Sequence, residues 1–261
     1  MNKTQWGILG AAVLLFFLLY FGCDTQPPER QRINAERLLA MESTGINTLL
    51  LEAKAELSSS VASDILALEQ RIDIAPNDSA KLELTEQLAG AWYRAEHPAI
   101  SGYYAQQIAE QRETAEAWSI AGTTFTICTQ RASEEKIRSF CGGRAVQAYE
   151  SAISLEPDNV SHRVNLALVY TSNPPSDNPM KGVLQLRELN NQYPTNTTVL
   201  IALGRLAIQT GQYARAIERL GEAVRLQPDN QAARCLLADA YQGNRQPELA
   251  ATYGAGCSTR N

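Results

Sequence analysis

The feature that most constrains this chain is a pattern of small and apolar residues that recurs about every 34 residues in its C-terminal half. Residues 197–230 hold two apolar patterns of helical spacing, one on each side of Gly211-Gln212. They predict two amphipathic helices joined by a tight turn, because apolar residues three or four apart share one helix face. The positions that carry the pattern are Leu200, Leu203, Gly204, Ala207, Tyr213, Ala216, Leu220 and Ala223. Pro228, followed by Asp229-Asn230, ends the second helix and begins the next unit.

The same pattern returns on both sides of this unit. A shift of 34 residues places Leu203 on Leu237, and a shift of 37 residues the other way places it on Leu166. The three extra residues fall in the loop 171–176. A further unit upstream has about 11 inserted residues around Ala132 to Ser139, where Ser133 is predicted to cap a helix. The predicted units are about 115–159, 160–196, 197–230 and 231–257.

This pattern resembles the tetratricopeptide repeat (TPR), whose unit is about 34 residues. Unit 197–230 carries the matching residues in order: Leu203-Gly204, Gly211, Tyr213, Ala216, Ala223 and Pro228. It departs at Leu200, where the family often has Trp, and at Ala207, where Tyr is usual. Trp118 and Tyr170 supply those types in the two units upstream. The resemblance implies an all-α solenoid of helical hairpins over residues 115–257.

Upstream of 115 the repeat pattern fades but the sequence remains helical. Ser79–Arg94 and Pro98–Arg112 predict a degenerate hairpin within residues 78–114, with its turn at His97-Pro98. Residues 33–77 predict two further helices, Ile33–Met41 and Ile46–Asp73, split near Thr44-Gly45.

The N-terminus predicts a membrane segment. Residues 4–23 contain no charged side chain, and about 20 such residues cross a bilayer core as a helix. The segment 1–23 is interpreted as an uncleaved signal anchor, followed by a proline-containing linker at 24–32. A cleaved signal peptide and a lipoprotein acylated at Cys23 are alternatives, although Tyr20 and Phe21 fit neither cleavage pattern well. The short, weakly basic head favours a soluble part that is periplasmic or otherwise extracytoplasmic.

Four more cysteines bear on the compartment. Cys128, Cys141, Cys235 and Cys257 form an even set, which is compatible with two disulfides in an exported domain. Proximity favours Cys128 with Cys141 and Cys235 with Cys257, since each pair spans one predicted hairpin. Four reduced, partly buried thiols are the alternative.

Composition and motifs give no support to an enzyme or a nucleic-acid binder. The net charge is −5 with scattered basic residues, while nucleic-acid binding draws much of its affinity from neutralised phosphates. No phosphate loop, nucleophile elbow or metal-ligand spacing occurs, and neither cofactor nor metal is expected. Adjacent Glu134 and Glu135 face different directions on a helix, so they form no catalytic pair.

The resemblance implies that the first helices of the units line a concave face that holds peptides or partner proteins. The family's ligand-facing positions fall on Asn165, Leu168, Ile201, Arg205, Ile208, Asp239 and Gln242. A chaperone-tail carboxylate would find only Arg205 among them, so a mixed apolar and polar peptide or a folded partner is expected. The chain is therefore interpreted as a protein-binding adaptor at a bacterial envelope membrane. A permanent subunit of a larger membrane complex and a lipoprotein assembly factor remain alternatives.

Overall fold

The computed structural model describes residues 45–257, and these form twelve helices without strands. The predicted membrane segment 4–23, the acylation candidate Cys23, the linker and the helix Ile33–Met41 lie outside the described residues. All twelve helices belong to one unit, Ile46–Asn261. Between residues 45 and 257, no helix combines the length and the apolar character that crossing a bilayer requires.

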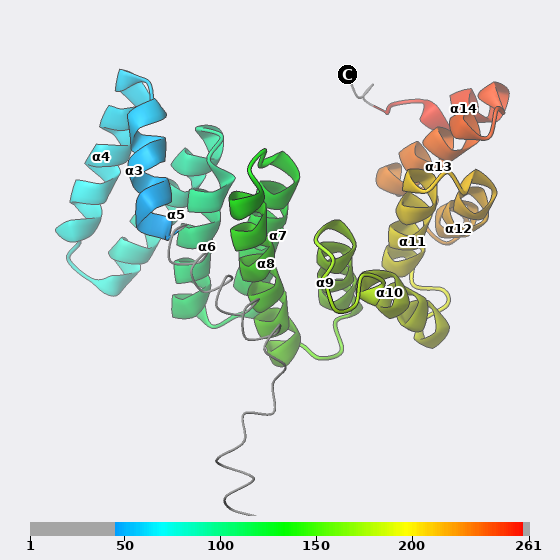
Figure 1. Cartoon of the computed structure of the whole chain (residues 1–261), viewed down its shortest axis with the longest axis horizontal. Coiled ribbons are helices and arrows are strands. Elements are labelled where there is room, and N and C mark those ends of the chain that lie inside the picture. Colours follow the sequence, from blue (N-terminus) through cyan, green and yellow to red (C-terminus); the bar gives the residue numbers. More distant parts are fainter. Residues whose placement is uncertain (1–44, 258–261) are drawn as a thin grey trace, which may run out of the picture. The chain divides into compact units, whose positions relative to one another are not determined.

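The helices form six consecutive hairpins (Figure 1). Their bounds are α3 Ile46–Glu56 and α4 Ser59–Asp73, α5 Asp78–Arg94 and α6 Pro98–Arg112, α7 Ala115–Arg131 and α8 Glu135–Leu155, α9 Val160–Ser172 and α10 Lys181–Gln192, α11 Thr197–Gln209 and α12 Tyr213–Leu226, and α13 Gln231–Gly243 and α14 Pro247–Gly254. From α4 to α14 each helix packs on the next, and α7, α9, α11 and α13 also contact one another in series. The described part is thus an all-α solenoid of the TPR type.

Side chains at the start of each hairpin set where its first helix begins. Asn159, Asn196 and Asn230 accept a hydrogen bond from a backbone N–H in the first turn of α9, α11 and α13, at 3.1, 3.2 and 3.0 Å. Asn77 and Thr114 do the same for α5 and α7. Each cap satisfies a donor that the helix cannot pair internally, worth about 1 kcal/mol. The predicted unit ends at Asn159, Asn196 and Asn230 are therefore helix starts.

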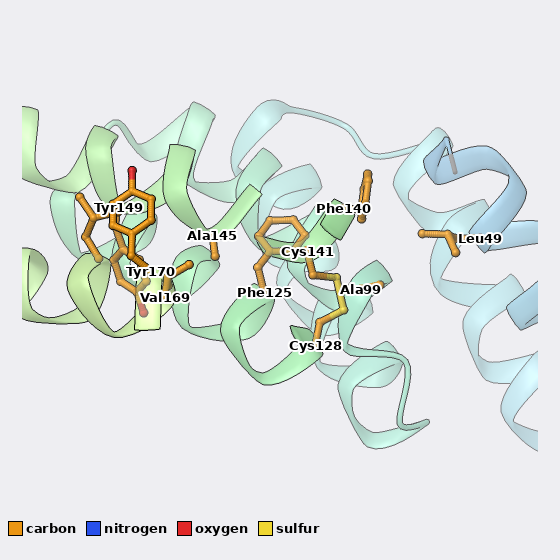
Figure 2. Packing of buried hydrophobic residues seen from close by; sticks show 11 residues of the cluster. Leu49, Ala99, Phe125, Cys128, Phe140, Cys141, Ala145, Tyr149, Val169 and Tyr170 are labelled. Carbon is orange, nitrogen blue, oxygen red and sulfur yellow. A yellow bond between two sulfur atoms is a disulfide. The ribbon is translucent and has the colours of Figure 1, made fainter. Parts of the chain in front are cut away.

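The core is a series of apolar clusters shared between neighbouring hairpins. Phe125, Tyr149 and Tyr170 belong to one that draws on α3, α6, α7, α8 and α9 (Figure 2). Trp92 and Ile65 belong to another, in which α4 and α5 meet. Fully burying such a side chain stabilises the fold by about 1.5–3 kcal/mol.

Three sequence expectations need correction. Ile46–Asp73 is two helices, because the chain breaks at Leu57-Ser58 so that α3 and α4 can each place apolar residues in the cluster around Trp92. The insertion around Ala132 to Ser139 lengthens helices rather than a loop: α7 has 17 residues and α8 has 21, while α9 and α11 have 13 each. Ser133 is not the cap of α8; that position is Glu134, which makes no side-chain cap bond.

The sulfur atoms of both cysteine pairs are bonded in the structure. Cys128, in the last turn of α7, joins Cys141 of α8 with their Cα atoms 6.0 Å apart, beside Phe125 (Figure 2). Cys235 of α13 joins Cys257, which follows α14, with a Cα separation of 5.7 Å. Ala250 is the buried residue of the eight-residue helix α14, so this short helix has little apolar anchorage of its own.

We predict that Cys257→Ser releases α14 without unfolding the upstream hairpins. A cross-link closing a loop of this length is worth about 3 kcal/mol by chain-entropy estimates, and repeat units are stabilised mainly by their neighbours. Hydrogen exchange followed by mass spectrometry should show loss of protection in residues 247–254 and none in residues 78–155. Equal protection of α14 in both proteins, or two free thiols in peptides of the unreduced protein, would refute the role of this disulfide.

Three hairpin turns share one backbone geometry but not one residue type. After α5, α11 and α13, the residue one beyond the helix cap adopts a positive φ: Glu96 at 64°, Gly211 at 70° and Arg245 at 61°. The next N–H in each case, from His97, Gln212 and Gln246, bonds back to the carbonyl five residues earlier. This is the Schellman ending, in which glycine avoids the steric cost of the left-handed conformation.

We therefore predict opposite effects for substitutions at equivalent turns. Glu96→Gly and Arg245→Gly should each stabilise the fold by about 0.5–1 kcal/mol, while Gly211→Ala should destabilise it by about 1 kcal/mol. Urea denaturation of each variant against the wild type checks this. A stabilising Gly211→Ala would contradict the assignment of strain to this position.

Candidate protein-binding groove

An apolar groove of about 810 Å³ lies among α5, α6, α7 and the start of α9. We call it the α5–α7 groove. Its walls come from α5 and α7, and its floor comes largely from α6. It exists because α5 and α7 both pack on α6, whereas the first helices of the later hairpins pack directly on one another.

Small residues make the floor of the groove. Ala105 and Ser101 of α6, Ala89 of α5 and Ala117 of α7 are all buried and line it. None of these side chains fills the space between the two walls. The floor is therefore low enough to receive side chains from a bound molecule.

The walls carry exposed apolar side chains. Ile120 of α7 is 54% exposed and Tyr93 of α5 is 40% exposed, and Ile108 and Ile127 line the same space. Apolar side chains gathered in a concavity and rimmed by charge are typical of a site that another molecule covers.

Hydroxyl groups of α7 lie along the same wall. Thr123 Oγ1 donates to the Ser119 carbonyl at 2.8 Å, and Thr124 Oγ1 donates to the Ile120 carbonyl at 2.9 Å. Thr123 Oγ1 also lies 3.0 Å from the Tyr149 hydroxyl. Because these hydroxyl hydrogens bond back to the helix, the wall offers acceptor lone pairs but few free donors.

The rim is charged, with its two signs at opposite ends. Arg94 lines the groove where α5 ends. The guanidinium carbon of Arg131 lies 6.0 Å from the centroid of the Tyr93 ring, but Arg131 itself lines a separate cavity together with Glu96 and Glu134. Glu116, in the first turn of α7, lines the other end together with Glu156. Arg112 and Glu86 form an ion pair with each other there, so neither leaves a full charge for a ligand.

A buried histidine lies at the acidic end of the groove. His162 is 6% exposed, and its Nε2 lies 3.3 Å from Glu156 Oε2. Asn159 Nδ2 donates to the same oxygen at 2.9 Å while its Oδ1 caps α9. The hydrogen bonds from Asn159 and His162 lower the pKa of Glu156 below its ordinary value.

The residues predicted from the repeat phase lie elsewhere. Asn165 and Leu168 are on α9, Ile201, Arg205 and Ile208 on α11, and Asp239 and Gln242 on α13. These helices are neighbours, but none of the seven residues lines the α5–α7 groove. Arg205, Asp239 and Gln242 are exposed, while Leu168, Ile201 and Ile208 are partly buried against core clusters. Binding at these seven positions stays a prediction.

Sequence reasoning missed the groove because it looked for ligand positions in the units that best match the repeat. The groove lies over the degenerate hairpin α5–α6 and the lengthened helix α7. Two signals were available: Tyr93 and Ile120 are large apolar residues out of phase with the buried stripes of their helices.

The described residues include no group of three or more His, Cys, Asp or Glu side chains placed to hold a metal ion. The two glutamates excluded as a catalytic pair each face a cation: Glu135 pairs with Arg138 at 2.6 Å and Glu134 with Lys136 at 3.2 Å.

Comparison with known proteins agrees with the helical-hairpin fold. Residues 204–244 match the TPR repeat family. The match spans the second half of α11, all of α12 and α13, and the turns between them. No curated protein matches the sequence.

Solved structures show the same architecture over more of the chain. A thermophilic TPR protein in Thermus thermophilus aligns with a TM-score of 0.50 at 16% identity, covering 75% of this chain and 98% of that one. The APC/C hetero-tetramer Cut9–Hcn1 aligns with a TM-score of 0.50 at 15% identity, covering 82% of this chain and 39% of that one. MamA from Desulfovibrio magneticus RS-1 aligns with a TM-score of 0.41 at 16% identity, covering 69% of this chain and 94% of that one. The two alignments with a TM-score of 0.50 show a likeness of fold alone.

We predict that the bonds to Glu156 contribute stability that depends on pH. A carboxyl whose pKa is lowered by folding contributes stability that is complete above its unfolded pKa and is lost as the pH falls through its folded pKa. Glu156→Gln should therefore lower the thermal midpoint at neutral pH, and the difference from the wild type should disappear in strong acid. A difference that stays constant from neutral pH to strong acid would show that ionisation of Glu156 plays no part.

Proposed function

We propose that this chain is a non-catalytic scaffold that binds another protein in the α5–α7 groove, and that residues 4–23 hold it at a bacterial envelope membrane. The observation that carries the binding function is the apolar groove, with Ile120 and Tyr93 exposed on its two walls. The charged residues around it give a mixed apolar and polar surface, which suits a protein segment.

The repeat architecture supports this function over catalysis. Hairpins stacked in series present long surfaces to a partner, and several units can contribute at once. The groove is lined by hydroxyl, carboxylate, guanidinium and imidazole groups. Four of these residues pair with one another: Arg112 with Glu86, and His162 with Glu156. No nucleophile with an adjacent base is assembled among the groove residues.

Two features of the sequence and structure support attachment outside the cytoplasm. The uncharged run 4–23 has the length of a membrane helix. The two disulfides are typical of proteins that fold in an oxidising compartment. Mass spectrometry of the purified N-terminus would distinguish an anchor from acylation at Cys23.

The groove and a matched surface site allow a direct test of binding. Ile120 lies in the groove and is 54% exposed, while Leu184, on the second helix α10, is 51% exposed and lies outside it. A photo-cross-linking residue at each position in the full-length chain, expressed in cells, should capture a partner from position 120 and not from position 184.

We further predict that Ile120→Glu lowers co-purification of the captured partner by about tenfold or more, because a charge would replace a central apolar contact. Leu184→Glu should leave the yield unchanged. One partner at a fixed ratio would indicate a subunit of a complex, and several partners below that ratio an adaptor. Equal capture from the two positions would refute the groove as the binding site.

A further inference from the structure

The shape of the α5–α7 groove restricts what it can bind. Its lining residues recur at helical spacing along each wall: Glu116, Ile120 and Thr124 on α7, and Ser101 and Ala105 on the floor. The groove therefore runs parallel to the helices. From Glu116 to Ile127 the wall of α7 spans about 16 Å at the rise of an α-helix, which corresponds to about three turns of a bound helix.

The polar chemistry of the walls favours a helical occupant over an extended one. An extended peptide brings unpaired backbone N–H and C=O groups that need partners. The wall of α7 is itself helical, so its amides are paired, and the hydroxyls of Thr123 and Thr124 already donate within it. A helix pairs its own backbone and needs only apolar contacts, which Ile120, Ile108 and Tyr93 offer.

The charges at the two ends fix a direction. The end of the groove where α5 finishes carries Arg94, and the end where α7 begins carries Glu116 and Glu156. Helices commonly carry acidic residues in the first turn and basic residues in the last, because these complement the helix dipole. A helix of that ordinary pattern matches the groove when it runs opposite to α5 and α7.

We propose that the occupant of the groove is an amphipathic helix of the partner protein, antiparallel to α5 and α7, with its acidic N-terminus against Arg94 and its basic C-terminus against Glu116 and Glu156. This inference rests on the protein-binding function proposed above and adds the class and the direction of the ligand.

The test uses two peptides of equal length and composition with the full-length chain in detergent micelles. Each has 17 residues, an apolar stripe at positions spaced three and four apart, and a lactam bridge that holds both equally helical. One carries three Glu in its first turn and three Lys in its last turn; the other alternates Glu and Lys within both turns, so that neither end has a large net charge. Both carry a photo-cross-linking residue at the N-terminus, which reports the direction of the bound helix. Fluorescence anisotropy measures the affinity of each.

We expect the first peptide to bind about tenfold more tightly than the second at low salt, with the difference shrinking as salt screens the charges. Its N-terminus should cross-link to the end of α5 around Arg94 rather than to the first turn of α7. The variant Arg94→Glu should remove the preference, because both ends of the groove are then acidic, and Ile120→Glu should weaken both peptides. Equal affinities, cross-linking of the N-terminus of the first peptide to the first turn of α7, or tighter binding of a variant of the first peptide with a central proline would overturn the inference.

The outcome separates this inference from the proposed function. Specific cross-linking from position 120 without binding of either peptide would refute the helical ligand and leave the protein-binding function standing. If neither specific cross-linking from position 120 nor peptide binding is observed, the helical ligand and the protein-binding function are both refuted.

Discussion

Close approach of neighbouring helices through residues with little or no side chain is the interaction on which the rest of this structure depends. At Gly204 a Cβ would lie 2.5 Å from Leu220 Cγ, and at Gly122 one would lie 2.9 Å from the Tyr149 ring. Each glycine thus admits a large side chain from the second helix of its hairpin. Ala121, Ala145, Ala216 and Ala223 are fully buried at similar contacts. The clusters are shared from hairpin to hairpin, so the array is held by many local contacts rather than by one central core.

The groove follows from a local change in this packing. The first helices from α7 onward also pack on one another, whereas α5 and α7 meet chiefly through α6. In other hairpins small residues let neighbouring helices approach closely. The small residues of α6 line the open floor of the groove instead. The groove therefore lies where the regular stacking is relaxed, upstream of the residues that match the repeat family.

Much of the fold could be predicted from the sequence because its determinants are local. Gly211 marks a turn, the three capping asparagines mark helix starts, and phased small residues mark helix contacts. The break at Leu57-Ser58 was missed although Ser58, followed by two more serines, is a residue type that favours helix starts and occupies the N-cap of α4. Both α3 and α4 place apolar residues in the cluster around Trp92. The groove was missed for a different reason. It depends on which helices fail to touch, and a residue pattern within one hairpin carries no information about that.

The lengthened hairpin α7–α8 has a consequence of a different kind. Its disulfide joins Cys128 and Cys141 on either side of the exposed residues Ser133 to Lys136. Loop tips of this sort are where proteases most readily cut a folded chain. A single cut there would leave the two halves of the array covalently joined, with the contacts between α7 and α8 intact. In a compartment that contains secreted proteases, such a molecule would continue to act as one piece after its backbone had been severed.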